Sequence, residues 1–168
     1  MRPAENDYAP YYKSYIEKIQ GDDILKILLH QTKECQNILN SFPEHKGNYR
    51  YAEGKWTVKQ VIGHIMDTER VFTYRALCIA RGEKQQLPGF EQDDYINTGK
   101  FESRNLFELI YELRLLRESN LLLFKSFDDE MLNRRGTASG YEVTVNALLF
   151  MIAGHMQHHL DILKERYI

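Results

Sequence analysis

The chain has 168 residues, of which 43% are hydrophobic, and its formal net charge is -2. This length and hydrophobic content predict one globular domain that buries about two thirds of the surface of its unfolded chain. A charge near zero without any block of like charge argues against nucleic acid or anionic membranes as partners.

The start of the chain and the lack of a long apolar run predict a cytoplasmic protein, and its two cysteines are expected to be buried. The first seven residues lack the apolar segment of a secretory signal, and no apolar run approaches the roughly 20 residues that span a bilayer. Cys35 and Cys78 have no CxxC spacing, and each falls inside an expected helix. We interpret both as buried thiols without a redox role.

Residues 1–21 are polar and rich in tyrosine, and they end at the helix breaker Gly21. We expect a partly extended lead-in that lays its aromatic rings on the surface of the domain. A single helical domain is expected over residues 22–168. Its first helix covers about residues 22–42, with Asp22 or Asp23 as the N-cap, and ends at Pro43.

The second helix is expected to begin after Thr57, because Gln60 three residues later completes a capping box, and to end near Arg81. The connection that follows, residues 82–101, holds Pro-Gly-Phe and then an acidic run. Two interpretations of this long connection stay open: a lid or crossover, and a surface loop with one helical turn.

The third helix is expected over about residues 104–127, with Ser103 as its N-cap and leucines near heptad spacing. We interpret it as core packing without chemistry. Residues 128–132 fit one further helical turn, and residues 136–143 fit a turn-rich loop.

The last helix is expected over residues 144–167, with Thr144 as its cap. Four helices of about 20 to 25 residues, no convincing strand period and three long connections indicate an all-α protein. The predicted architecture is a four-helix bundle with long connections and at least one crossover.

Three of the six histidines lie on this last helix. Residues four apart differ by only about 40° around a helix, so the imidazoles of His155 and His159 can converge on one atom. His158 is rotated away and has Asp161 three residues later, so we interpret it as a partly exposed ion-pair partner. His30 lies in the expected first helix and His45 in the loop that follows it, and both are expected at the surface.

A third ligand is suggested by two glycines. Gly63 and Gly154 are the only glycines well inside expected helices, and each immediately precedes a histidine. In one interpretation each glycine permits close helix approach and its neighbouring histidine is incidental. In the other, both Gly-His pairs face one cleft, so that His64, His155 and His159 meet.

Three neutral imidazoles are ligands for a divalent transition metal such as Zn, Ni, Cu or Fe(II). Three protein ligands with an open position are typical of a reactive site, since structural sites are normally closed. A metal held in this way lowers the pKa of bound water toward about 7 or binds a thiol as thiolate.

Several segments of the chain together resemble the DinB-like superfamily, and the similarity extends from about Asp22 to the end. The matching segments are GKWTVKQVIGH (54–64), DTER (67–70), LPGFEQD (87–93) and GHMQHH (154–159). The resemblance implies a four-helix bundle that holds a divalent metal, usually zinc or nickel, through three histidines. These three positions fall on His64, His155 and His159.

The resemblance also implies two kinds of enzyme. Some members are similar to S-transferases that use a low-molecular-weight thiol, such as bacillithiol or mycothiol, as co-substrate, and others are described as metal-dependent hydrolases. Gly63-His64 departs from the His-His pair that is common in the bacillithiol-transferase branch.

Two function classes follow from these observations. The first is an enzyme whose metal activates a thiol or water for a small-molecule substrate, with candidates for proton transfer or ligand orientation near the cleft: Asp67, Glu69, Tyr74 and Tyr141. The second is a non-catalytic metal or small-ligand binding protein of a stress response.

The long seam of the third helix either completes a monomer core or supports a homodimer.

Overall fold

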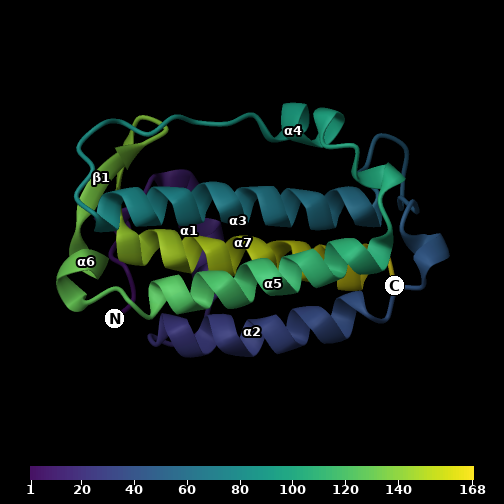
Figure 1. Cartoon of the computed structure of the whole chain (residues 1–168), viewed down its shortest axis with the longest axis horizontal. Coiled ribbons are helices and arrows are strands. Elements are labelled where there is room, and N and C mark those ends of the chain that lie inside the picture. The colour runs from purple at the N-terminus through teal and green to yellow at the C-terminus, as the bar shows by residue number, and fades with distance from the viewer.

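Four long helices run side by side along the molecule (Figure 1): α2 (Ile24–Leu39), α3 (Val58–Ala80), α5 (Leu106–Phe124) and α7 (Val145–Arg166). This computed structural model describes all 168 residues. Each of α3 and α2 packs against both α5 and α7. The predicted four-helix bundle is therefore confirmed, and none of its helices combines the length and apolarity that crossing a bilayer demands.

The long connection between α3 and α5 is a crossover. Because α3 and α5 run in the same direction, the chain has to return along the whole bundle between them (Figure 1). This segment carries α4 (Gln92–Thr98), which packs on α3, and then a 3-10 turn at Phe101–Ser103. The crossover interpretation is correct, and the expected helical turn is part of it.

Side-chain caps fix where the long helices begin. The hydroxyl of Thr57 accepts the N–H of Gln60 at 3.2 Å, and the Gln60 side chain accepts the N–H of Thr57 at 2.9 Å, so the expected capping box is present. Thr144 caps α7 by accepting the N–H of Ala147. Asp23 caps α2, which ends at Leu39, a little short of the expected end.

The prediction that Ser103 is the N-cap of the third long helix is wrong. Asn105 takes this role, since its Oδ1 accepts the N–H groups of Phe107 and Glu108. Ser103 lies in the preceding 3-10 turn, where its hydroxyl donates to the carbonyl of Lys100. Asparagine is as good a cap as serine, and here it is the residue that adjoins the first helical turn.

The expected turn-rich loop before α7 is a β-hairpin instead. After the short helix α6 (Asp129–Asn133), strand β1 (Arg135–Ala138) pairs antiparallel with β2 (Tyr141–Thr144). The two turn residues, Ser139 and Gly140, both have positive φ, 53° and 82°. Such a turn matches the right-handed twist of two paired strands and therefore closes a hairpin. The strands are too short for an alternating pattern to be recognised in the sequence.

The lead-in is more helical than expected. It contains 3-10 turns at Glu5–Asp7 and Pro10–Tyr12 and the short helix α1 (Lys13–Glu17). α1 packs against α7, and Ile16 and Ile19 are buried there. Tyr15 therefore lies over the middle of the last helix, edge-on against His155, whereas Tyr12 meets Phe72 of α3.

The core has two apolar parts separated by a buried polar group. One part lies along residues 72–80 of α3 and 145–153 of α7, and the other along 58–66 and 156–163 of the same helices. Between them, the guanidinium of Arg117 donates two hydrogen bonds of 2.8 Å to Glu69. The third long helix therefore contributes a buried ion pair to the core in addition to its leucines.

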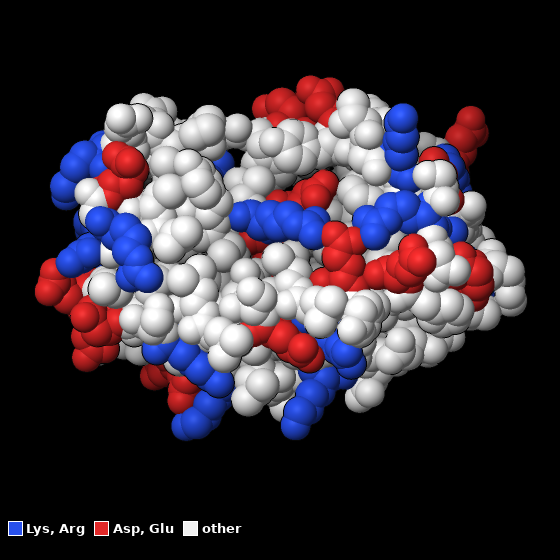
Figure 2. Space-filling model, in the orientation of Figure 1, with Lys and Arg blue, Asp and Glu red and all other residues white.

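Charged side chains are mixed on the surface. Figure 2 shows acidic and basic groups interspersed over the face formed by α3 and α5, without a large area of one sign. Many of them form ion pairs between neighbouring elements, such as Lys164 with Glu34 at 2.7 Å and Lys18 with Asp161 at 3.0 Å.

Candidate metal centre

Three histidine side chains converge between α3 and α7. The Nε2 atom of His155 lies 2.9 Å from Nε2 of His64 and 3.1 Å from Nε2 of His159. All three side chains are buried, with residue exposures of 4%, 5% and 8% for His64, His155 and His159. The expected meeting of these histidines is observed.

Hydrogen bonding alone does not satisfy this cluster. A neutral imidazole nitrogen offers either one N–H or one lone pair, so Nε2 of His155 makes a good hydrogen bond with only one of its two close partners. A cation that accepts all three lone pairs would satisfy the three nitrogens at once. The residues present therefore fit a divalent transition metal ion.

The protonation state of the cluster also suits metal binding. Burial, with a smaller contribution from His158, lowers the pKa of His64 to about 4. Burial and then the neighbouring histidines lower the pKa values of His155 and His159 well below the ordinary range. All three imidazoles are therefore neutral at physiological pH, which is the form that ligates a metal.

The helical glycines permit close contacts beside the cluster. A Cβ atom on Gly63 would lie 2.4 Å from the ring of Phe101, and one on Gly154 would lie 2.2 Å from the carbonyl oxygen of Tyr15. The close approach therefore involves the end of the crossover and α1, not α3 against α7. The first interpretation is correct that the glycines permit close packing, and the second is correct that their histidines meet.

Aromatic rings surround the imidazoles. The ring of Trp56 lies 4.7 Å from that of His64 and 6.4 Å from that of His159. Tyr15 meets His155 edge-on at 5.6 Å. These rings restrict the rotation of the imidazoles and keep water from most of their surface.

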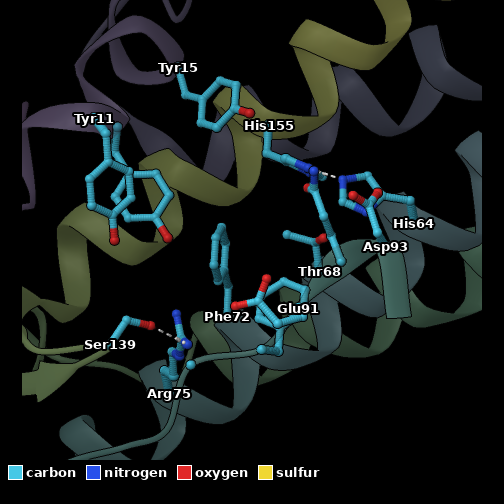
Figure 3. A pocket seen from close by; sticks show the side chains of 14 residues that line it. Tyr11, Tyr15, His64, Thr68, Phe72, Arg75, Glu91, Asp93, Ser139 and His155 are labelled. Atoms are coloured by element: carbon cyan, nitrogen blue, oxygen red, sulfur yellow. Dashed lines mark hydrogen bonds between the residues drawn. The ribbon is translucent and has the colours of Figure 1, made fainter. Parts of the chain in front are cut away.

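A cavity of about 490 Å³ opens beside His64 and His155 (Figure 3). One wall is a single stripe of α3, formed by His64, Thr68, Phe72 and Arg75. These positions are four, eight and eleven residues along from the first, so on a helix they all point within about 80° of one another. The other walls come from the lead-in tyrosines, residues 89–93 of the crossover and Ser139 of the hairpin.

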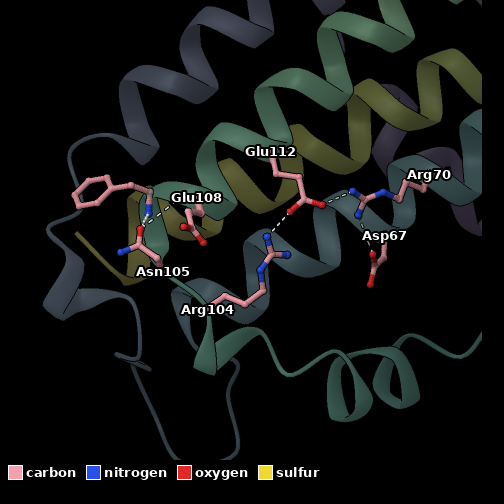
Figure 4. A network of polar contacts seen from close by, with 7 residues as sticks. Asp67, Arg70, Arg104, Asn105, Glu108 and Glu112 are labelled. Carbon is pink, nitrogen blue, oxygen red and sulfur yellow. Dashed lines mark hydrogen bonds and ion pairs between the residues drawn. The ribbon is translucent and has the colours of Figure 1, made fainter.

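Two of the candidates for proton transfer or ligand orientation, Asp67 and Glu69, lie on α3 and form ion pairs away from the cavity. Asp67 pairs with Arg70 at 3.3 Å, and Arg70 continues to Glu112, which also binds Arg104 (Figure 4). Glu69 is buried on the opposite side, where it binds Arg117. Neither carboxylate lines the cavity.

The two expected tyrosines also lie outside the cavity. Tyr74 is 56% exposed and Tyr141 is 49% exposed, and the latter stacks edge-on against Tyr11. In their place the structure brings Tyr12 and Tyr15 to the cavity. Their position depends on how the lead-in folds over α7, which no local sequence pattern indicates.

The remaining histidines and the cysteines have ordinary surroundings. His158 is half-buried beside Tyr15, and its expected partner Asp161 instead accepts hydrogen bonds from Lys18 and Gln157, both at 3.0 Å. His30 and His45 are exposed, as expected. The expected burial of the thiols holds for Cys35, whereas Cys78 is only half-buried.

Sequence reasoning missed Arg75 and Trp56. Arg75 carries a usable signal, because its spacing of eleven residues from His64 places it on the same face of α3. Trp56 precedes the helix, and its position over the histidines depends on the path of the loop that begins at Pro43.

Both the sequence and the four-helix fold of this chain are similar to those of known proteins. The sequence profile of the DinB superfamily matches residues 28–163, and the chain belongs to this superfamily. A protein of Oceanobacillus iheyensis named "Putative metal-dependent hydrolase" is 25% identical over 156 residues, which cover 88% of this chain and 87% of that protein.

Solved structures share the fold. YfiT of Bacillus subtilis, described as a probable metal-dependent hydrolase with an unusual four-helix bundle topology, superposes with a TM-score of 0.74 at 15% identity over 98% of this chain and 90% of its own. A mycothiol-dependent maleylpyruvate isomerase superposes with a TM-score of 0.69, also at 15% identity, over 87% of this chain and 61% of its own. At these identities the similarity concerns the fold alone.

Proposed function

We propose that this chain is a metal-dependent enzyme that hydrolyses a small molecule, with a zinc or nickel ion held by His64, His155 and His159. The observation that carries the proposal is the convergence of three buried, neutral imidazoles beside a cavity. An ion with three protein ligands keeps a position for water or substrate, which is typical of catalytic and not of structural sites. Such an ion lowers the pKa of bound water toward about 7.

The chain's own residues supply a small-molecule site around this position. The cavity has the volume of a small-molecule pocket, about 490 Å³, and aromatic rings form much of its wall. The hydroxyl of Thr68, one turn from His64, is buried without a hydrogen-bond partner. A polar group of a bound substrate would satisfy this hydroxyl and would be oriented by it.

A thiol S-transferase is the second candidate. It is favoured by the similarity of the fold to a mycothiol-dependent isomerase, and the same ion would hold a low-molecular-weight thiol as thiolate. Hydrolysis is preferred because the Oceanobacillus relative and YfiT both carry the description of metal-dependent hydrolase.

The metal content of the purified protein tests the site. We expect about one equivalent of zinc or nickel per chain by inductively coupled plasma mass spectrometry, and loss of most of it in His155→Ala. His158→Ala is the matched control, because His158 is a neighbour on α7 that lies outside the cluster. Equal metal content in the wild type and in His155→Ala would remove the proposed centre.

The reaction is tested with metal-loaded protein and the His64→Ala variant. A panel of esters, lactones and amides measures hydrolysis, and monochlorobimane with bacillithiol or mycothiol measures thiol transfer. We expect hydrolysis that depends on both the metal and His64. Metal-dependent conjugation without hydrolysis would favour the transferase, and metal binding without either activity would leave a binding protein.

A further inference from the structure

Two arginines are buried in this protein, and only one has an acidic partner. Arg117 is 1% exposed and is neutralised by two hydrogen bonds to Glu69. Arg75 is 2% exposed, and no carboxylate lies within 4 Å of it. Its Nη2 donates to the carbonyl of Pro88 at 2.7 Å and to the hydroxyl of Ser139 at 2.9 Å, both of which are neutral.

A buried guanidinium without a counter-charge is costly. Arginine keeps its charge at physiological pH, and burying an ion without a partner lowers stability unless something else compensates. Nε of Arg75 is buried without any hydrogen-bond partner. The neutral carbonyl and hydroxyl satisfy one nitrogen of the group and leave its charge unbalanced.

The position of Arg75 indicates what would balance this charge. Its side chain lines the same cavity as His64 and His155, at the opposite end of the α3 stripe (Figure 3). The rings of Phe72 and Phe90 lie 5.7 and 6.0 Å from the guanidinium carbon and help to hold it in place. A buried cation held at the end of a cavity is suited to bind an anionic group of a ligand.

We propose that the cavity takes small molecules with a carboxylate group, which pairs with Arg75 while the remainder of the molecule extends toward the three histidines. The placement of the reacting part rests on the proposed function, whereas the carboxylate contact does not. Arg75 follows His64 by eleven residues, about 16 Å along the helix axis. Its side chain leans back toward the helix N-terminus, which shortens the span that the ligand has to bridge.

A carboxylate fits this cavity better than a phosphate. Glu91 and Asp93 of the crossover line the same cavity. Their negative charges would repel a dianionic phosphate more strongly than a singly charged carboxylate.

The experiment compares three probes of similar shape: 3-phenylpropanoate, its neutral amide 3-phenylpropanamide, and 2-phenylethyl phosphate. Dissociation constants are measured by titration calorimetry or ligand-observed NMR on protein treated with chelator, so that no metal ion attracts the anion. We expect the carboxylate to bind at least tenfold more tightly than the amide and the phosphate. A carboxylate that binds no better than the amide, or less tightly than the phosphate, would overturn the proposal.

Variants separate the charge of Arg75 from its role in packing. Arg75→Gln should reduce the preference for carboxylate over amide to near one, and Arg75→Lys should keep part of it. Arg81→Gln is the matched control, because Arg81 is an exposed arginine at the end of α3 that lies outside the cavity, and its preference should stay close to that of the wild type. Circular dichroism checks that each variant is folded, and the wild-type preference tests the proposal even if Arg75→Gln does not fold.

Failure of the carboxylate site and failure of the proposed hydrolase function give different experimental results. If the metal-free protein prefers the carboxylate but the metal-loaded protein hydrolyses none of the panel, the carboxylate site stands and the hydrolase proposal fails. If the metal-loaded protein is an active hydrolase and the metal-free protein shows no preference for the carboxylate, the carboxylate site fails alone.

Discussion

Single side chains decide the geometry of the candidate metal centre, and only some of them could be predicted. The histidine cluster could be predicted from the spacing of His155 and His159 and from the paired Gly-His positions. A regular helix converts spacing in sequence into direction in space. Trp56 and Tyr15 could not be found in the same way. Each reaches the histidines through an irregular segment whose path depends on tertiary packing.

The absence of a side chain at Gly154 permits the close packing of α1 on α7 beside the imidazoles. Alanine is intrinsically better than glycine in a helix by about 1 kcal/mol. Here, however, the new methyl group would lie 2.2 Å from the carbonyl oxygen of Tyr15 and 2.5 Å from its carbon. Because these are backbone atoms, no change of rotamer relieves the overlap, and α1 has to move away from α7.

We therefore expect Gly154→Ala to lower the free energy of unfolding by about 1 to 3 kcal/mol, measured by urea denaturation. Gly63→Ala is the comparison, because its methyl group would meet the ring of Phe101, a side chain that is able to shift. The loss in Gly63→Ala should be the smaller one. A Gly154→Ala variant more stable than the wild type would mean that α1 is not closely packed on α7.

At the scale of elements, long periodic helices were predictable and short elements were not. Thr57 with Gln60 and Thr144 are local capping signals next to apolar stripes, so they identify helix starts reliably. The hairpin has four residues in each strand, too few for an alternating pattern to be recognised. The lead-in helix α1 has five residues and is stabilised mainly by its packing on α7.

Helix α5 contains a buried charged residue that its apolar periodicity did not indicate. Its leucines predict packing correctly, but the same stripe contains Arg117, whose charge is balanced by Glu69 of α3. The pair is almost completely buried, with side-chain exposures of 1% and 2%, and Asn120 adds a hydrogen bond of 3.0 Å to the same carboxylate. The sequence separates the partners by 48 residues, so only the arrangement of the helices brings them together.

Glu69→Gln tests this pair with almost no change in shape. The variant leaves the guanidinium of Arg117 buried without a counter-charge, and we expect it to lose on the order of 3 kcal/mol of unfolding free energy at neutral pH. Replacing both residues by apolar ones, in Glu69→Leu with Arg117→Met, should cost less than Glu69→Gln alone, because no charge remains buried. Wild-type stability in Glu69→Gln would show that the pair is not needed to balance the charge.

At the scale of the whole molecule, the bundle and its crossover followed from the number of helices and the lengths of their connections. The sequence did not give the order of the helices in the bundle, although the paired Gly-His positions suggested that the second and the fourth helix face one another. In the structure α3 packs on α7, and this contact brings together histidines that are 91 residues apart in the chain. The crossover then returns over α3 and closes one side of the cavity. A homodimer, which the sequence left open beside a monomer, stays a prediction.

Because the three histidines belong to two helices at distant positions in the chain, a metal ion bound to them would stabilise the whole bundle. The unfolded chain holds no such site, so binding shifts the equilibrium toward the folded state by RT ln(1 + [L]/Kd), about 4 kcal/mol at a free metal concentration 1,000 times Kd. For a protein of this size that corresponds to a rise in melting temperature of roughly 10 °C. Differential scanning calorimetry of chelated protein, with and without added zinc or nickel, measures this shift.

The same measurement on two variants locates the effect. His155→Ala should show little or no shift, because it removes the central ligand of the cluster. His158→Ala should keep the wild-type shift, because its side chain lies beside Tyr15 and outside the cluster. An equal rise in both variants would mean that the metal binds elsewhere on the surface. A rise that is lost in His155→Ala and in His64→Ala but kept in His158→Ala would show that the ion joins α3 to α7, and that metal binding and the stability of the bundle are thermodynamically linked.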